Sequence, residues 1–117
     1  MLITLANGSL EAALALSFKP HNRPDLFGKT PEAIVKLAFA QGVPVLVANP
    51  GHLSRLPTKA RGIGLSHDAI NLDQALVEAL KVFQAQHIEA IKAQHPKTTL
   101  AAIARLAIQL GLESFDA

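Results

Sequence analysis

The segment from Leu100 to Leu110 constrains the fold more than any other part of this chain, because almost every residue in it is apolar. Only Arg105 and Gln109 interrupt it, and on a helix these two positions lie one turn apart on a single narrow stripe. A helix at a protein surface buries roughly a third to a half of its circumference. This helix therefore needs cover on nearly every side, which a central position in one chain or the pairing of two copies can provide.

We expect the pairing of two copies, a homodimer closed across a two-fold axis. Such a dimer would bury the same helix face in both copies and so cover the apolar surface that one small chain leaves open. The expected interface residues are Leu100, Ile103, Leu106, Ala107 and Leu110.

The N-terminal residues predict a short strand and then an ambiguous segment. Residues 2–6 are typical of a strand, and Asn7-Gly8 after them is a strong signal for a tight hairpin turn. Residues 9–18 fit a helix with Ser9 as its N-cap, and their alternating leucines also fit a strand that returns from the turn. The Ala and Leu content favours the helix.

A clear helix start follows a proline-rich loop. Thr30-Pro31-Glu32 combines a capping hydroxyl, a proline at the first helical position and an acidic first turn. We expect Gly42 to end this helix in the C′ position. Residues 43–48 are then expected to form a buried strand, in which Pro44 indicates an edge or strand-start position. Residues 49–51 are expected to form a turn.

The last third predicts a helical hairpin. A helical pattern begins at Asn71 or Asp73 and ends at Pro96, and the second helix covers about residues 100–110. The expected fold class is α+β, with a small two- or three-stranded sheet from the N-terminal half. The whole chain, 1–117, is expected to form a single domain, in which 1–70 is a mixed α/β part with basic loops and 71–117 is helical.

Charge is concentrated in the middle of the chain. Residues 19–61 hold seven Lys or Arg against two acidic residues, a net charge of +5, whereas residues 62–117 carry −2. A basic segment can contact phosphate or an acidic partner. The candidate nucleic-acid contacts are Lys29, Arg55, Lys59 and Arg61. Because the chain has no Trp and no Tyr, duplex contact is a better expectation than single-strand binding, which uses aromatic stacking.

No catalytic or metal-binding motif is complete. Gly28-Lys29-Thr30 resembles the end of a phosphate-binding loop, but Arg23 occupies the position of its first glycine. Ser66-His67-Asp68 cannot form a triad, because triad residues converge from separate positions. The five histidines do not have metal-ligand spacing, and the chain has no cysteine. We expect a protein that is not an enzyme and that binds no cofactor and no metal.

The chain shows no signal peptide, and we find no apolar run of the ~18 residues that a membrane span needs. We therefore expect no membrane partner. Together with the lack of cysteine, this favours a cytoplasmic location.

Residues 98–112, TTLAAIARLAIQLGL, resemble the second helix of the ribbon-helix-helix DNA-binding proteins, with a polar start and Gly-Leu at the end. The resemblance implies that this helix packs against its dimer mate and that Thr98 and Thr99 anchor a DNA phosphate. It also implies a first helix at about residues 81–95 and a base-contacting strand at residues 74–80. The periodicity of residues 74–80 favours a helix instead.

The leading hypothesis is a homodimer that contacts duplex DNA in transcription regulation. Two alternatives remain open. The first is a protein-protein interaction or adaptor module that uses the apolar last helix. The second is a small-molecule or phosphate-binding fold built on the strand expected at residues 43–48.

Overall fold

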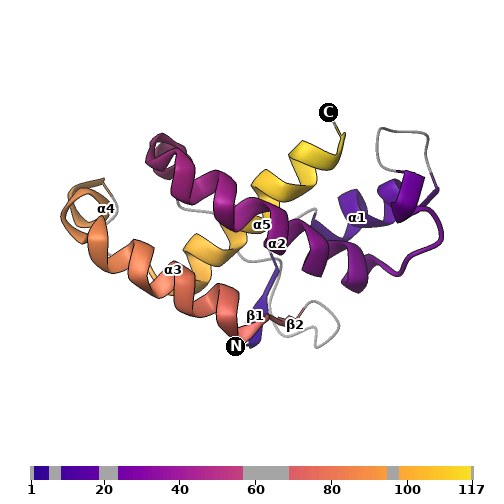
Figure 1. Cartoon of the computed structure of the whole chain (residues 1–117), viewed down its shortest axis with the longest axis horizontal. Helices are drawn as coiled ribbons and strands as arrows, with labels where there is room; N and C mark the ends of the chain where they lie inside the picture. The colour runs from indigo at the N-terminus through magenta and orange to yellow at the C-terminus, as the bar shows by residue number, and fades with distance from the viewer. Residues whose placement is uncertain (1, 6–8, 19–23, 57–68, 95–97, 117) are drawn as a thin grey trace.

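Two long helices, α2 (Pro31–Ala48) and α5 (Leu100–Asp116), cross at the centre of the computed structural model, and the other elements surround them (Figure 1). The structure describes residues 2–5, 9–18, 24–56, 69–94 and 98–116. Its Cα radius of gyration is 13.8 Å, close to the value of about 13 Å expected for a compact domain of this length.

The remaining elements are short. In chain order they are β1 (Leu2–Thr4), α1 (Ser9–Phe18), the 3₁₀ turn η1 (Pro24–Leu26), the 3₁₀ turn η2 (Pro50–Arg55), β2 (Ala69–Asn71), α3 (Gln74–Gln86) and α4 (Ile88–Gln94). This mostly helical chain with one small antiparallel sheet confirms the α+β class. The C-terminal helical pattern and the helix at residues 9–18 are confirmed as well.

The sheet joins distant parts of the chain. Strand β1 pairs antiparallel with β2, with Ile3 opposite Ile70. The Asn7-Gly8 turn lies outside the described residues. The strand partner of β1 is therefore β2, and residues 9–18 form α1 instead of returning as a second hairpin strand.

Helix α2 begins where the sequence predicts and extends six residues beyond Gly42, the residue expected to follow its end. Thr30 caps it by accepting a hydrogen bond from the amide of Ala33 at 3.2 Å. The helix then continues through Gly42 and Pro44 to Ala48. The predictions of a stop at Gly42 and of a strand at residues 43–48 are wrong.

The reason for Gly42 lies in the crossing of α2 and α5. A Cβ built on Gly42 would overlap the carbonyl oxygen of Ala107, and one built on Gly111 would overlap that of Ala38. Each helix thus contributes an alanine and, four residues later, a glycine to the same crossing. Gly42 is needed for this close backbone approach and does not mark a helix end.

The core extends through both parts of the chain. Its largest fully buried side chains include Phe39, Phe83 and Phe115. One connected cluster of buried residues joins β1, α1, α2, α3 and α5. The division at residue 70 therefore separates segments of the sequence that share one core.

Of the two expected starts, Asn71 and Asp73, the structure favours the second, since Asp73 caps α3 by accepting hydrogen bonds from the amides of Ala75 and Leu76 at 2.8 and 3.4 Å. Residues 74–80 lie within α3, so they form a helix and do not supply the strand that the ribbon-helix-helix family places there. His87 separates α3 from α4, and its ring centroid lies 4.6 Å from that of Phe83.

Helix α2 also corrects the expectation about membrane-spanning length. Among the described residues it is the one helix long and apolar enough to cross a bilayer, with 18 residues of mean hydropathy 1.4. A count of uninterrupted apolar residues misses it because of Glu32 and Lys36. Length and composition are weak criteria here, since core helices of globular proteins meet them too, and α2 packs against α5 in the core.

Candidate ligand-binding pocket

A hollow of about 530 Å³ lies between the first half of α2 and the start of α3. This volume falls within the range of about 300–1,000 Å³ that small-molecule sites occupy. It is lined by Lys29, Ala33, Lys36, Leu37, Phe39, Ala40, Asn71, Leu72, Asp73 and Leu76. Within the described residues it offers an apolar wall with charged groups beside it.

The α2 wall follows from helical spacing. Ala33, Lys36, Leu37 and Ala40 occupy positions i, i+3, i+4 and i+7, which share one face of a helix. The two alanines reach only one carbon from the backbone, so they leave space that larger side chains would fill. Leu37 is 37% exposed, so an apolar group in the pocket could cover it.

The opposite wall comes from the end of β2 and the first turn of α3. Leu72 is buried and Leu76 is half-buried, and both contribute apolar surface. Asn71 adds an amide, and Asp73 adds a carboxylate. Because Oδ1 of Asp73 already accepts from the amides that begin α3, much of its negative charge is balanced by that helix end.

Two lysines dominate the charge of the pocket. The side chains of Lys29 and Lys36 line it and are exposed, and a lysine ammonium carries three donors and no acceptor. The pocket is therefore suited to a carboxylate or phosphate group with an apolar body. No group of three potential metal ligands occurs among the described residues.

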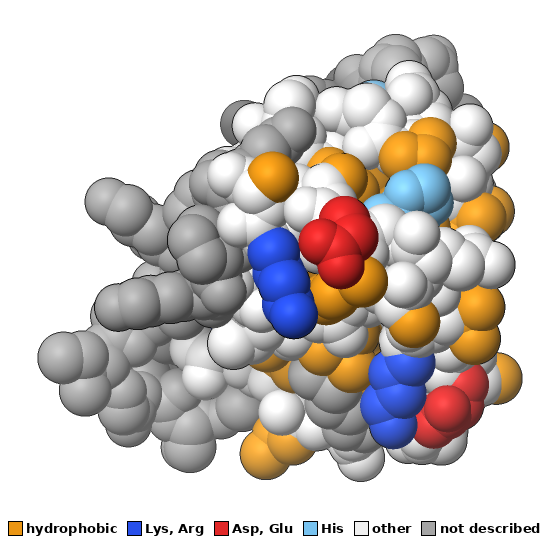
Figure 2. Space-filling view, turned by 90° about the vertical axis from the view of Figure 1, so that its left-hand side faces the viewer, with side chains coloured by type: hydrophobic (Ala, Val, Ile, Leu, Met, Phe, Trp, Pro, Cys, Tyr) orange, Lys and Arg blue, Asp and Glu red, His pale blue; other side chains and the backbone are white. Residues whose placement is uncertain are grey.

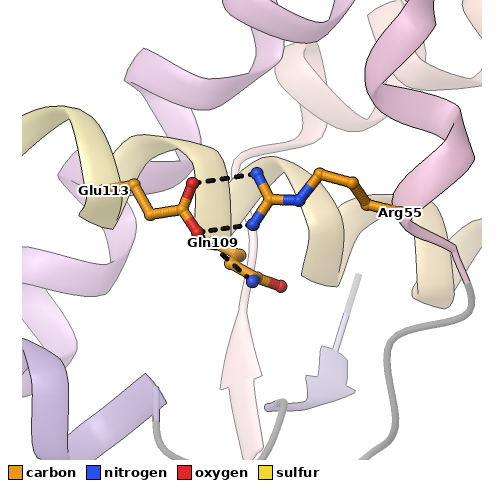
Figure 3. Close-up of polar contacts among 3 residues, drawn as sticks. All are labelled: Arg55, Gln109 and Glu113. Atoms are coloured by element: carbon orange, nitrogen blue, oxygen red, sulfur yellow. Dashed lines mark hydrogen bonds and ion pairs between the residues drawn. The ribbon is translucent and has the colours of Figure 1, made fainter.

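The four residues predicted to contact nucleic acid do not lie together in the structure as far as it describes them. Lys29 lines this pocket. Arg55 pairs with Glu113 of α5 through two parallel hydrogen bonds, of 2.8 and 2.5 Å (Figure 3). Lys59 and Arg61 lie outside the described residues. The structure therefore brings one of the four predicted cations to the pocket and ties another to a carboxylate elsewhere.

The pair of Arg55 and Glu113 fastens η2 to α5. The hydrogen bond from Arg55 lowers the pKa of Glu113, and the carboxylate in turn raises the pKa of Arg55. Gln109, one turn before Glu113, donates a further hydrogen bond to the same carboxylate at 3.3 Å. Arg55 already has a structural partner, which makes it a weaker candidate for contacting phosphate.

Cationic side chains do not form a continuous face on the side of the molecule drawn in Figure 2. The Lys and Arg side chains visible there lie near acidic ones, and hydrophobic side chains separate them. In helix α3, Lys81 lies 3.2 Å from a carboxylate oxygen of Glu78. The described residues on this side therefore offer no broad basic surface.

The two threonines at the start of α5 also differ. Thr99 accepts a hydrogen bond from the amide of Ala102 at 3.2 Å and so acts as a helix cap. Thr98 is half-buried, and its hydroxyl oxygen has no hydrogen-bond partner among the described residues. The cap on Thr99 competes with the phosphate-anchoring role that the family resemblance implies.

The residues expected at a dimer interface lie inside one chain. Ile103, Leu106 and Ala107 are fully buried, Leu110 is nearly so, and Leu100 is half-buried against the core. The cover that the apolar helix requires is thus supplied by elements of the same chain. Homodimerisation stays a prediction, which sedimentation of the pure protein tests.

Sequence reasoning missed the pocket residues Lys36, Asn71 and Asp73 as a group. Lys36 counted only toward net charge, and Asp73 only as one of two candidate helix starts. The available signal was a lysine between two alanines on one helix face, at positions 33, 36 and 40. That signal does not show which element lies opposite, so the hollow was not visible from sequence.

Comparison of this chain with protein-family models, with curated proteins and with solved structures finds no match. The function therefore has to be argued from the geometry of the pocket and the surface.

Proposed function

We propose that this chain is a non-catalytic binding protein whose ligand is a small molecule with an apolar body and an anionic group. The observation that carries the proposal is the pair of exposed lysines, Lys29 and Lys36, beside an apolar hollow of about 530 Å³. We also propose a cytoplasmic location, because a chain without cysteine forms no disulfide and so needs no oxidising environment.

The apolar body of the ligand would lie against Leu37, Leu72 and Leu76. Covering such side chains contributes about 0.8 kcal/mol for each buried methylene group. Medium-length alkyl chains are therefore the simplest probes, because their number of methylene groups can be varied one at a time.

The anionic group would lie between Lys29 and Lys36. Charge-assisted hydrogen bonds contribute about 1.5–3 kcal/mol when water is excluded, and less at exposed lysines, where salt screens them. The same two charges would repel a cationic head group. Discrimination between anion and cation at constant chain length is thus the sharpest signature of this site.

The test uses decanoate, decyl phosphate, decanol and decylamine below their micelle-forming concentrations. Binding is followed by the melting temperature and by NMR amide shifts, because the lack of Trp and Tyr removes the usual fluorescence signal. We expect the two anions to raise the melting temperature, decanol to have a smaller effect and decylamine none. Equal shifts for decanoate and decylamine would contradict the proposal.

A matched pair of lysine variants locates the site. Lys36→Ala removes one pocket charge and should weaken decanoate binding by about tenfold, which corresponds to about 1.4 kcal/mol. Lys81→Ala removes an exposed lysine of α3 that pairs with Glu78 outside the pocket, and should leave binding unchanged. Equal affinity of both variants and wild type would place the ligand elsewhere.

Contact with duplex nucleic acid is the second candidate function, and the net charge of +5 over residues 19–61 favours it. Its contacts would be Lys29 with the basic residues of that segment, in a protein of transcription regulation. Binding to a duplex should then fall steeply with salt. A pocket-filling variant separates the functions, since Ala40→Leu should abolish decanoate binding and leave duplex binding intact.

A further inference from the structure

Two segments of this chain repeat each other in sequence. Residues 30–43, TPEAIVKLAFAQGV, and residues 99–112, TLAAIARLAIQLGL, are identical at six of fourteen positions without a gap. The first residue of each segment, Thr30 or Thr99, caps the helix that follows by accepting a backbone hydrogen bond at 3.2 Å. Helices α2 and α5 are therefore equivalent elements, 69 residues apart in the chain.

The strands and helices before these segments correspond as well, at an interval of 67 residues. Strand β1 then matches β2, with Ile3 and Ile70 as equivalent buried residues. Helix α1 matches α3, with Leu16 and Phe83 as equivalent buried residues. The chain thus contains two related units, each with a strand, a helix and then a long helix.

An approximate two-fold axis relates the two units. In the antiparallel sheet, Ile3 lies opposite its own equivalent in β2. At the helix crossing, Gly42 meets the carbonyl group of Ala107. The equivalent glycine, Gly111, meets the carbonyl group of Ala38. Helices α1 and α3 lie on opposite sides of this crossing (Figure 1). One polypeptide therefore has the internal symmetry that two identical subunits have in a homodimer.

By the same correspondence, the pocket between α2 and α3 has an equivalent place between α5 and α1, which also contact each other. We call this place the α5 site and define it by Thr4, Leu5, Ala102, Arg105 and Leu106, which correspond in that order to the pocket residues Asn71, Leu72, Ala33, Lys36 and Leu37. The two sites differ in exposure, since Leu37 is 37% exposed and its equivalent Leu106 is 0% exposed. The same framework therefore surrounds an open site in one unit and a closed site in the other.

Arg105 reaches across the α5 site. Its guanidinium donates a hydrogen bond to the carbonyl oxygen of Thr4 at 3.2 Å and so joins α5 to β1. Burial lowers the pKa of Arg105, as expected for a cation that is partly withdrawn from water. Its equivalent in the pocket, Lys36, is exposed. The two sites thus differ at this position in both the cation and its surroundings.

We propose that this residue determines whether each site accepts a ligand, so that Arg105 closes the α5 site and Lys36 leaves the pocket open to an anionic amphiphile. The proposal rests on the proposed function, because it concerns selection by the same pocket. A guanidinium is weakly hydrated and presents a planar set of donors, whereas a lysine ammonium is strongly hydrated and mobile. An arginine at position 36 should therefore bind the backbone of Asn71 as Arg105 binds that of Thr4.

The charge-conserving variant Lys36→Arg tests the proposal in the full chain. Charge alone predicts that arginine binds decanoate as well as lysine does, whereas closure of the pocket should weaken binding of both decanoate and the neutral probe decanol by about tenfold or more. Lys36→Ala removes charge and adds no bulk, so it should weaken decanoate more than decanol. Lys81→Arg, outside the pocket, is the control and should bind like wild type. Binding of both probes by Lys36→Arg at wild-type affinity would overturn the proposal.

The reciprocal variant, Arg105→Lys, should open the α5 site. Nuclear Overhauser contacts from the decanoate chain should reach the methyl groups of Leu37 in wild type, and those of Leu106 as well in Arg105→Lys. The double variant Lys36→Arg/Arg105→Lys should move the contacts from Leu37 to Leu106, which a loss of folding cannot produce. Contacts to Leu106 in wild type, or none in a folded Arg105→Lys, would contradict the role of Arg105.

A measurement without ligand separates this inference from the proposed function. If wild type binds none of the decyl probes, the proposed function fails, but the closing role of an arginine at position 36 is still tested. Lys36→Arg should raise the melting temperature by roughly 2–6 °C, because it gains the kind of hydrogen bond that Arg105 makes, and Lys81→Arg should not. An unchanged melting temperature of Lys36→Arg would overturn the inference whether or not wild type binds a probe.

Discussion

The two sides of α2 use the same small residues with opposite results. On one side, Ala38 and Gly42 let the backbone of α5 approach so closely that a single added carbon would overlap a carbonyl group. On the other side, Ala33 and Ala40 face α3 across a hollow. Small side chains permit close packing when a backbone fills the space they leave, and they create a cavity when none does.

The difference follows from what stands opposite each side. Helix α5 presents its own small positions, Ala107 and Gly111, at the crossing, so the two backbones meet. The segment that leads into α3 presents Leu72, Asp73 and Leu76, and the hollow lies between these residues and the first half of α2. One helix thereby has a rigid structural side and a side open to a ligand.

The strongest test of this comparison is Gly42→Ala. Although alanine favours helix by about 1 kcal/mol over glycine, overlap with the carbonyl of Ala107 should cost more, with a net loss of about 3 kcal/mol in the free energy of unfolding. Urea denaturation measures it. Gln41→Ala, at the exposed neighbouring position, should change stability little, and a neutral Gly42→Ala would show that the crossing is loose.

A substitution at Pro44 tests the side of α2 that lines the pocket. It lies seven residues after Leu37, on the face that lines the pocket, and it is exposed. A proline inside a helix removes one backbone hydrogen bond, and can cost about 3 kcal/mol. Ala40, four residues before Pro44, is exposed as well, and we expect Pro44→Ala to stabilise the fold by about 1–2 kcal/mol. Thermal unfolding measures this gain, and destabilisation would contradict it.

The ion pair of Arg55 and Glu113, which joins η2 to α5, is expected to make a smaller, pH-dependent contribution to the free energy of unfolding. Since folding lowers the pKa of Glu113, its contribution is complete above the unfolded value of about 4.3 and disappears as pH falls through the folded value. Both side chains are partly exposed, so we expect less than about 1 kcal/mol.

The corresponding variant is Glu113→Gln, compared with Glu89→Gln on α4 as a control. Urea denaturation at pH 7 and at pH 3 should show that Glu113→Gln reduces the loss of stability on acidification, whereas Glu89→Gln leaves it unchanged. An identical pH dependence of wild type and Glu113→Gln would mean that the pair adds nothing to stability.

The smallest expected effect on stability belongs to Ala40→Leu. This change adds three carbons only two positions from Gly42, yet the space beside Ala40 is open. We expect a change within about 0.5 kcal/mol, as at other exposed positions, together with loss of decanoate binding. A loss of stability like that of Gly42→Ala would erase the difference between the two sides.

Local signals in the sequence predict several of the helix starts. The cap at Thr30 with Pro31 fixes the start of α2, and the pattern that begins at Asn71 or Asp73 gives the start of α3 to within a few residues. Such signals act within one turn and need no information from the rest of the chain. The all-round burial of α5 could be predicted from composition alone. The element that covers α5 could not be predicted, because a partner copy and helix α2 would satisfy the same requirement for burial.

The mistakes have a common physical cause. Gly42 followed by Pro44 indicates a helix end locally, but in the structure the glycine faces α5 and the proline faces away from the crossing. The three-residue strand β2 forms because it pairs with β1, which lies far from it in the sequence. Such long-range contacts, like the pocket between α2 and α3, leave no local pattern.

The crossing of α2 and α5 also bears on synthesis of the chain. Gly42 leaves the ribosome about 70 residues before its partner Gly111, an interval on the order of 3–14 s at roughly 5–20 residues per second. During that interval the apolar face of α2 has no permanent cover, and β1 waits similarly for β2. The core that joins α2 to α5 can therefore close only after α5 has been synthesised.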